Sequence, residues 1–321
     1  MSLTTLKSQQ VTYLTIVADY AGQRIDNFLL THCKGVPKSH IYRILRTGEV
    51  RINQGRVKPT YRLQMGDTLR LPPIQYLQSE SPQTPNAHIL QRLTQSVVYE
   101  DASLLVINKP AGLAVHGGSG IDFGVIEGLR ALYPNAKNME LVHRLDRETS
   151  GCLMIAKKRS LLRQLHELLR EGKIRKHYLA LVKGAWPARL TQVELPLHKN
   201  VLQSGERFVR VNIEGKPSQS QFKVIQHFAT ATLLQVRPLT GRTHQIRVHT
   251  AHQGHPIAGD EKYGDETFNR YLRDFALKRL FLHATQLEIG LDSPITVNAP
   301  LPTDLQQVLQ RLTTSAETTH A

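Results

Sequence analysis

The segment HRLDRETSG, residues 143–151, decides how this chain is interpreted. It precedes the apolar run CLMIA at 152–156, so we expect a loop that leads into a buried strand. Its last three residues suit a tight turn. Asp146 lies between Arg144 and Arg147, and nearby positive charge favours an ionised carboxylate. The loop by itself leaves two interpretations open, a reactive carboxylate or a surface ion pair.

Two further segments place polar side chains among predicted strands. The first, TGRTHQIRVH at 240–249, follows the apolar run 231–239 and alternates in character. We expect a strand with these side chains on one side, facing either a site or solvent: Thr243, Gln245, Arg247 and His249. The second, KHYLALV at 176–182, predicts a strand with Tyr178 and Ala180 on one face. A tyrosine in such a strand more often packs than reacts.

The remainder of the C-terminal region, residues 93–312, predicts an α+β fold. Apolar runs indicate strands at 103–110, 151–158, 178–184, 221–228 and 231–239. One amphipathic helix is expected from its cap Ser160 to Gly172. Strands outnumber helices and do not alternate regularly with them, which favours a mixed, largely antiparallel sheet over a doubly wound parallel one.

The N-terminal region contains a small basic unit. Residues 1–22 form an extension with one predicted strand, and residues 23–72 carry ten Lys and Arg against three Asp and Glu. Ser39 is expected to cap a short helix that Gly48 ends. Three basic side chains of that segment fall on its solvent side: Lys38, Arg43 and Arg46. Two short helices followed by small strands resemble the S4 RNA-binding module, although a merely solvated basic face gives the same pattern.

Bulk properties narrow the classes of partner and compartment. The net charge of +15 raises the local concentration of polyanions, so RNA, DNA or an anionic membrane surface could be a partner. We expect residues 73–92 to form a linker and 313–321 a disordered tail. Two cysteines cannot build a disulfide framework, and no apolar run is long enough to span a membrane. These features predict a cytoplasmic protein without a membrane association.

Three segments in this order and spacing resemble the RluA-type family of pseudouridine synthases: HRLDRETSG, KHYLALV and TGRTHQIRVH. Residues 108–120 and 202–220 extend the likeness over nearly the whole chain. They favour the members that act on bacterial large-subunit (23S) ribosomal RNA over those directed to tRNA. Glu148 stands where Asp is also common, and Cys152 where an aliphatic residue is usual. Neither departure touches the expected chemistry.

The resemblance implies a role for five residues. Asp146 matches the nucleophilic aspartate, Arg247 its paired arginine and Tyr178 a tyrosine beside the target base. Ile246 matches an apolar residue packed under that base, and Arg144 an arginine that enters the RNA stack. The target uridine would be flipped out of its helix. Isomerisation involves no redox change and no net hydrolysis, so neither a cofactor nor a metal is expected. We also expect a monomer.

Two other functions fit parts of the sequence. A non-catalytic RNA-binding factor for ribosome assembly would need only the basic unit and the fold. A metal-dependent hydrolase would use a histidine-rich run: His244, His249, His252 and His255. That run has no acidic residue or cysteine at a typical ligand spacing, so we expect no metal there.

Overall fold

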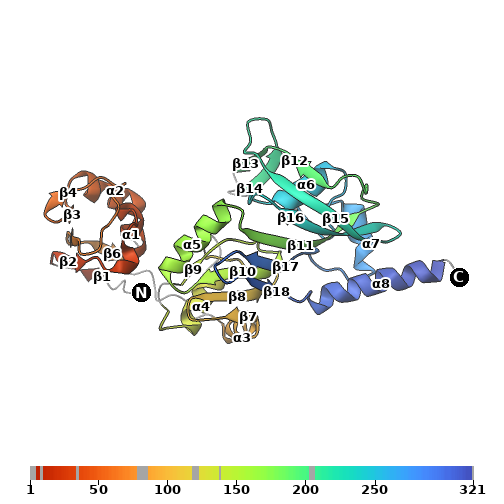
Figure 1. Ribbon diagram of the computed structural model, residues 1–321, viewed down its shortest axis with the longest axis horizontal. Helices are drawn as coiled ribbons and strands as arrows, with labels where there is room; N and C mark the ends of the chain where they lie inside the picture. The colour runs from red at the N-terminus through yellow and green to blue at the C-terminus, as the bar shows by residue number, and fades with distance from the viewer. Residues whose placement is uncertain are drawn as a thin grey trace. The chain divides into compact units, whose positions relative to one another are not determined.

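The computed structural model describes residues 5–7, 10–33, 36–77, 86–117, 123–136, 139–201 and 207–319. The chain divides into two compact units, residues 1–84 and 85–321, shown in Figure 1. Two stretches that carried part of the family resemblance, 118–120 and 202–206, lie outside the described residues.

The first unit combines two helices with short antiparallel strands. Its helical elements are η1 (Ala18–Tyr20), α1 (Ile25–His32) and α2 (Lys38–Arg46). One sheet has the order β2-β5-β3-β4, from β2 (Thr12–Thr15), β3 (Arg51–Ile52), β4 (Gly55–Arg56) and β5 (Thr68–Leu71). A second pairing joins β1 (Thr5–Lys7) to β6 (Gln75–Leu77). Ile41, Ile44 and Leu45 of α2 are buried in this unit's core, so the basic side of α2 is left to solvent.

The second unit is built on a ten-stranded sheet, whose main path runs β12-β15-β16-β11-β17-β10-β8-β7. Its strands are β7 (Val97–Glu100), β8 (Leu104–Lys109), β9 (Glu140–Leu141), β10 (Ser150–Ala156), β11 (Ile174–Lys183), β12 (Gln192–Glu194), β15 (Gln219–His227), β16 (Ala231–Pro238), β17 (Leu282–Ile289) and β18 (Ile295–Asn298). All pairs are antiparallel except β10 with β17. The mixed, largely antiparallel sheet is therefore confirmed.

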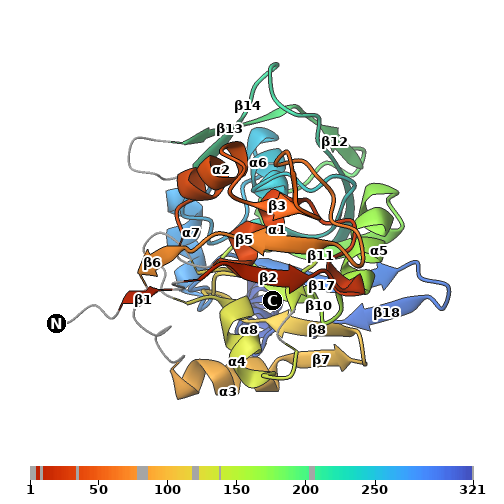
Figure 2. The same cartoon turned by 90° about the vertical axis from the view of Figure 1, so that its left-hand side faces the viewer.

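Helices and one hairpin surround this sheet. The helices are α3 (Ala87–Gln95), α4 (Val125–Leu132), α5 (Arg159–Arg170), α6 (Gln245–His252), α7 (Glu266–Arg273) and α8 (Thr303–Thr319). Helix α5 packs on β10 and β11, while α6 packs on β15 and β16. The hairpin of β13 (Leu197–Val201) and β14 (Arg207–Val211) also contacts α6, as Figure 2 shows near the top of the molecule. Within residues 5–319 as described, no helix is long and apolar enough to cross a membrane.

One expected strand is a helix. Residues 245–252 form α6, so the alternating arrangement of Thr243, Gln245, Arg247 and His249 on one side of a strand was wrong. The buried residues follow helical spacing instead: Gln245, Ile246, Val248, His249 and Thr250. Three of them are polar, and Thr250 donates to backbone carbonyls of its own helix, whereas Gln245 and His249 reach further. These two find partners on a distant segment, because Gln245 donates to Ser220 Oγ and His249 Nε2 lies 2.8 Å from Ser218 Oγ.

Three expected boundaries also change. The linker at 73–92 contains β6 and the start of α3, because β6 pairs with β1 and the Asn86 side chain caps α3. The tail at 313–321 was expected to be disordered, but α8 continues to Thr319. Neither serine cap is used, since α2 begins after Pro37 and α5 after Lys158. In the expected linker, the structure comes from the pairing of β6 with β1 and from the Asn86 cap of α3.

Candidate active site

The loop that carries Asp146 is fixed at the edge of the central sheet. It connects β9 to β10, and Thr149 N–H donates to the Asp146 carbonyl at 3.2 Å. Directly after it, Gly151 has a φ of 111° and pairs with Ala284 of β17. A Cβ at Gly151 would stand 2.2 Å from the Ala284 carbonyl oxygen, so only glycine fits. The approach of β17 therefore holds the loop at its C-terminal end.

A buried lysine holds the same loop from the other side. Lys109 ends β8, is fully buried, and donates from Nζ to the carbonyl oxygens of Pro110, Leu113 and Arg147 at 2.8, 2.9 and 3.0 Å. Gly112 N–H donates to the Arg147 carbonyl as well. Burial lowers the pKa of Lys109 to about 7. The residue after Asp146 is thus tied to a second segment of the chain.

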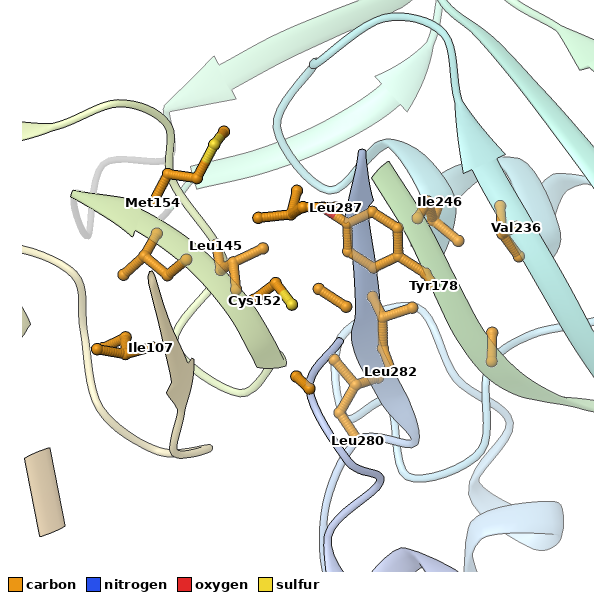
Figure 3. Close-up of a cluster of buried hydrophobic side chains, with 14 of the residues drawn as sticks. Ile107, Leu145, Cys152, Met154, Tyr178, Val236, Ile246, Leu280, Leu282 and Leu287 are labelled. Carbon is orange, nitrogen blue, oxygen red and sulfur yellow. The ribbon is translucent and has the colours of Figure 1, made fainter. Parts of the chain in front are cut away.

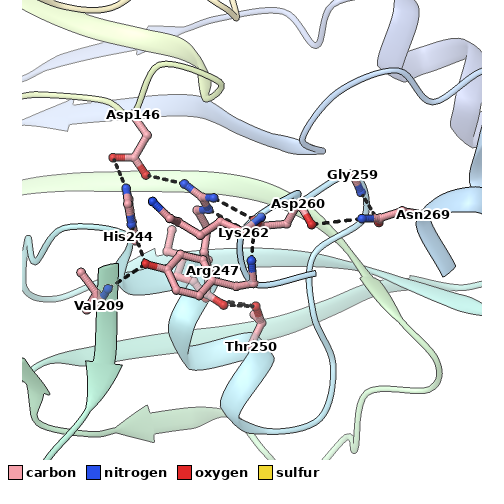
Figure 4. Close-up of polar contacts among 11 residues, drawn as sticks. Asp146, Val209, His244, Arg247, Thr250, Gly259, Asp260, Lys262 and Asn269 are labelled. Atoms are coloured by element: carbon pink, nitrogen blue, oxygen red, sulfur yellow. Dashed lines mark hydrogen bonds and ion pairs between the residues drawn. The ribbon is translucent and has the colours of Figure 1, made fainter. Parts of the chain in front are cut away.

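Arg247 stands between two carboxylates, as Figure 4 shows. It donates to both oxygens of Asp260, from Nε at 2.7 Å and from a terminal nitrogen at 2.8 Å. Its other terminal nitrogen lies 3.5 Å from Asp146 Oδ2. Burial would raise the pKa of Asp260, but hydrogen bonds from Arg247 and from backbone N–H groups outweigh it and hold that pKa below its usual value. Asp260 therefore orients the guanidinium whose free edge faces Asp146.

His244 faces the other oxygen of Asp146. Its Nε2 lies 3.8 Å from Asp146 Oδ1, and its Nδ1 lies 2.7 Å from the Tyr263 hydroxyl. Val209 N–H donates to the same hydroxyl at 2.9 Å, and the Arg247 guanidinium sits 5.0 Å from the centre of the Tyr263 ring. Burial lowers the pKa of His244 to about 4, so the imidazole is neutral near pH 7.

Asp146 opens into a small cavity of about 100 Å³. Its lining contains all five residues that the family resemblance singled out: Arg144, Asp146, Tyr178, Ile246 and Arg247. Figure 3 shows the Tyr178 ring in one apolar cluster with Leu145, Ile246 and Leu282. Burial, followed by the charge of Asp146, raises the pKa of Tyr178 well above its usual value, so its phenol stays protonated. The cavity offers a flat apolar wall beside a carboxylate.

A larger groove of about 1330 Å³ meets this cavity at Arg144 and Asp146. Arg144 is exposed on its wall. Other cations line the same groove: Arg147, Lys262, Lys278 and Arg279. A polyanion in the groove would pass these cations on its way to Asp146.

The three basic residues predicted to bind RNA belong to the first unit. Lys38, Arg43 and Arg46 are exposed on α2, as the helical spacing indicated. Arg43 already pairs with Glu49 at 3.1 Å, which neutralises part of its charge. Their role in RNA binding stays a prediction.

The histidines of the run 244–255 contact different parts of the fold and do not gather at one point. His249 contacts Ser218, and His255 Nδ1 lies 2.8 Å from the Lys183 carbonyl oxygen. In the described part of the chain, no group of three or more His, Cys, Asp or Glu side chains is placed to hold a metal ion.

Comparison with known families matches the two units separately. Residues 103–252 match the RNA pseudouridylate synthase family, and residues 23–69 match the S4 domain. These matches, with the relatives described next, show that the chain belongs to the pseudouridine synthase family. It is an isomerase that carries an S4 domain.

Curated relatives and solved structures refine this class. Ribosomal large subunit pseudouridine synthase C of Escherichia coli (strain K12) is 54% identical over 312 residues, which cover 95% of this chain and 98% of that protein. The protein of the same name from Pasteurella multocida is 53% identical over 311 residues, 95% of each chain. The structure of human RNA Pseudouridylate Synthase Domain Containing 4 is 27% identical, with a TM-score of 0.59 over 70% of this chain and 96% of that one.

Sequence reasoning missed the residues that support Asp146. Lys109, Asp260 and Tyr263 were not singled out, and His244 was considered only as part of a histidine run. In the sequence, the hint of a special position at Asp260 is the glycine directly before it, and the structure shows why glycine stands there. Gly259 precedes it with a φ of 73°, and a Cβ there would stand 2.1 Å from the Arg279 carbonyl oxygen. The ion pair itself joins residues thirteen positions apart through the turn after α6, which periodicity does not reveal.

Proposed function

We propose that this protein isomerises uridines of large-subunit (23S) ribosomal RNA to pseudouridine, with Asp146 as the nucleophile. The observation that carries the proposal is the arrangement around Asp146. Its carboxylate lies 3.5 Å from Arg247, and both line one cavity with Tyr178 and Ile246. The substrate class follows from the 54% identity to an enzyme named for the ribosomal large subunit.

The target base leaves its helix to reach the cavity, which costs a few kcal/mol of stacking. Arg144, exposed where groove and cavity meet, would occupy the place that the base vacates. Basic residues of the S4 unit, among them Lys38, Arg43 and Arg46, would add phosphate contacts that position the RNA without reading its sequence. These contacts offset the cost of flipping.

In the cavity, the uracil would pack between Tyr178 and Ile246 with its ribose towards Asp146. Asp146 attacks C1′ as the C1′–N1 bond breaks, and the detached uracil turns. C5 then bonds to C1′ and the electron pair of the C1′–O bond returns to Asp146. The proton on C5 passes to a base or water while N1 takes up a proton, so the product is an isomer of the substrate with no net gain or loss of protons. A glycal route, in which Asp146 first takes the C2′ proton, uses the same carboxylate. The protein would do this in the cytoplasm, as a monomer.

The test is a map of pseudouridines in 23S RNA from bacteria that lack this protein. Complementation with the wild-type gene should restore specific sites, and Asp146→Ala should restore none while the purified variant still binds RNA. Arg144→Ala should give partial modification, about 10- to 100-fold slower, because only insertion into the stack is weakened. Modification at wild-type level by Asp146→Ala would refute the role of Asp146, and an unchanged map in the deletion strain would refute the substrate.

A further inference from the structure

His244 occupies an uncommon backbone conformation beside Asp146. Its φ and ψ are 53° and 20°, a left-handed region that only a few per cent of non-glycine residues adopt, with histidine among the more frequent of them. It stands immediately before α6 and its side chain gives the helix no capping bond. The imidazole instead lies between the Tyr263 hydroxyl and Asp146. Figure 4 shows His244 pointing towards Asp146.

The hydrogen-bond partners of Tyr263 determine where the imidazole proton lies. The Tyr263 hydroxyl accepts from Val209 N–H at 2.9 Å, and it has one hydrogen left to donate. His244 Nδ1 lies 2.7 Å away. A neutral imidazole has one N–H and one acceptor nitrogen. If Tyr263 donates to Nδ1, then Nε2 carries the proton.

The opposite tautomer is unfavourable here. With the proton on Nδ1, the lone pair of Nε2 would point at Asp146 Oδ1, and the Tyr263 hydrogen would be left without this acceptor. With the proton on Nε2, every polar atom from Val209 to Asp146 has a complementary partner. Neutral His244 is consistent with its burial, because its side chain is only 14% exposed.

We propose that Tyr263 holds His244 as the Nε2–H tautomer, and that His244 is a positioning residue that donates to Asp146 Oδ1. This rests on the proposed role of Asp146. Arg247 faces Oδ2, so the two donors would fix the carboxylate at both oxygens. The separation of 3.8 Å is longer than a hydrogen bond. We expect it to shorten when the base and ribose fill the cavity, because catalytic hydrogen bonds often tighten only in the substrate complex.

The reaction explains the use of a neutral donor. Whether Asp146 bonds to C1′ or takes the C2′ proton, its negative charge disappears in one step and returns in another. A donor on Oδ1 stabilises the returning charge. A neutral imidazole does so with less attraction for the resting carboxylate than a second cation would have, and so leaves Asp146 reactive.

One tyrosine serves both partners of Asp146. The Tyr263 hydroxyl meets His244, and its ring face lies 5.0 Å from the Arg247 guanidinium. Phe208 packs on the same ring with centroids 5.1 Å apart. Substitution by phenylalanine therefore removes the hydroxyl while it retains the ring, which separates the two roles.

The first experiment reads the tautomer without any substrate. Nitrogen NMR of protein labelled in histidine, with His244 assigned by comparison with His244→Gln, should show Nε2 protonated and Nδ1 unprotonated. In Tyr263→Phe this preference should weaken, because Nδ1 loses its donor. A proton on Nδ1 in the wild-type protein would overturn the proposal.

The second experiment measures single-turnover pseudouridine formation on saturating 23S RNA fragments, together with RNA affinity. His244→Ala should slow the reaction about 10- to 100-fold with unchanged affinity. His244→Gln, whose amide can donate from a similar position, should recover part of the loss. Tyr263→Phe should slow it about 3- to 10-fold. His252→Gln, an exposed histidine of the same helix, is the matched control and should react as wild type.

A double variant tests whether Tyr263 acts through His244. In the His244→Ala background, Tyr263→Phe should have almost no further effect on the rate. Fully additive losses, or a wild-type rate in His244→Ala, would overturn the proposal. If Asp146→Ala remained active, the proposed function itself would fail, whereas an inactive Asp146→Ala with an unaffected His244→Ala would refute only the role of His244.

Discussion

Asp146 and Asp260 are two carboxylates on one arginine, and their surroundings differ. The Asp260 side chain is fully buried, accepts two short bonds from Arg247 and accepts backbone N–H groups of Lys262 and Tyr263. The Asp146 side chain is 18% exposed, faces Arg247 at 3.5 Å and opens into the cavity. The oxygens of Asp260 are occupied, while those of Asp146 are available to a substrate. The number of donors therefore separates a structural carboxylate from one that is open to a substrate.

The largest expected effect comes from Asp146→Asn. The substitution removes the proposed nucleophile, so the single-turnover rate should fall at least about 10⁴-fold. Its long, partly exposed ion pair contributes little to folding, and the free energy of unfolding should change by less than about 1 kcal/mol. Rate measurements check the loss of activity, and urea denaturation of the same preparation checks the free energy of unfolding. A large loss of stability would show that Asp146 is structural as well.

Asp260→Asn should, in contrast, reduce stability as well as activity. It leaves the buried Arg247 without its charged partner, and breaking such a pair costs about 3–5 kcal/mol of the free energy of unfolding. Activity should fall as well, because Arg247 loses its orientation towards Asp146. Urea denaturation should show this loss, and Asp304→Asn is a matched control because its bidentate pair with Arg279 is more exposed. Equal losses in both variants would show that the burial of the Asp260–Arg247 pair does not decide its contribution to stability.

As the pH falls, protonation of His244 and protonation of Asp260 should reduce the free energy of unfolding in different pH ranges. Burial lowers the pKa of His244 to about 4 from 6.5, so the folded state resists a proton that the unfolded chain takes up. The stabilisation is complete above about pH 6.5 and is lost as pH falls towards about 4. The pKa of Asp260 lies below 3.8, so the stabilisation from its ionised form is lost only in stronger acid.

The free energy of unfolding should therefore fall between about pH 6.5 and 4, and His244→Gln should reduce the slope by about one proton, or about 1.4 kcal/mol per pH unit. His249 and His283 contribute in the same range, because burial lowers the pKa of each to about 4 as well. Denaturation curves at several pH values check the slope. An unchanged slope in His244→Gln would mean that its imidazole is not held neutral.

The smallest expected effect is on RNA affinity, from substitution of an exposed cation on α2. Lys38→Ala should weaken RNA binding about 2- to 4-fold and reduce the salt slope by about 1. Arg43→Ala should have a smaller effect, because Glu49 already neutralises part of its charge. Filter binding between about 50 and 200 mM salt distinguishes the two variants. Identical effects would show that the Glu49 pair opens when RNA binds.

The sequence predicted much of this molecule because apolar runs and helical spacing record burial. The strands β8, β10, β11, β15 and β16 and helix α5 lie where these patterns placed them. The family motifs brought Asp146, Tyr178 and Arg247 to one cavity, although their chemical roles stay predictions. Residues 245–252 were predicted wrongly because the burial of Gln245 and His249 depends on Ser220 and Ser218, over twenty positions away. Long-range polar pairing leaves no periodic trace in a single sequence.

Gly151 has a consequence for how this enzyme can vary. Gly151 lies five positions after Asp146. Because it has no Cβ, the Ala284 carbonyl can approach its backbone more closely than any other residue would allow. Glu148, three positions earlier, is exposed and free of such a contact. In a library of random variants, position 148 should accept many residues and position 151 almost none. The tolerance of this loop to mutation therefore changes abruptly within three residues. The strictest position is the one where the close approach of β17 leaves no room for a Cβ atom.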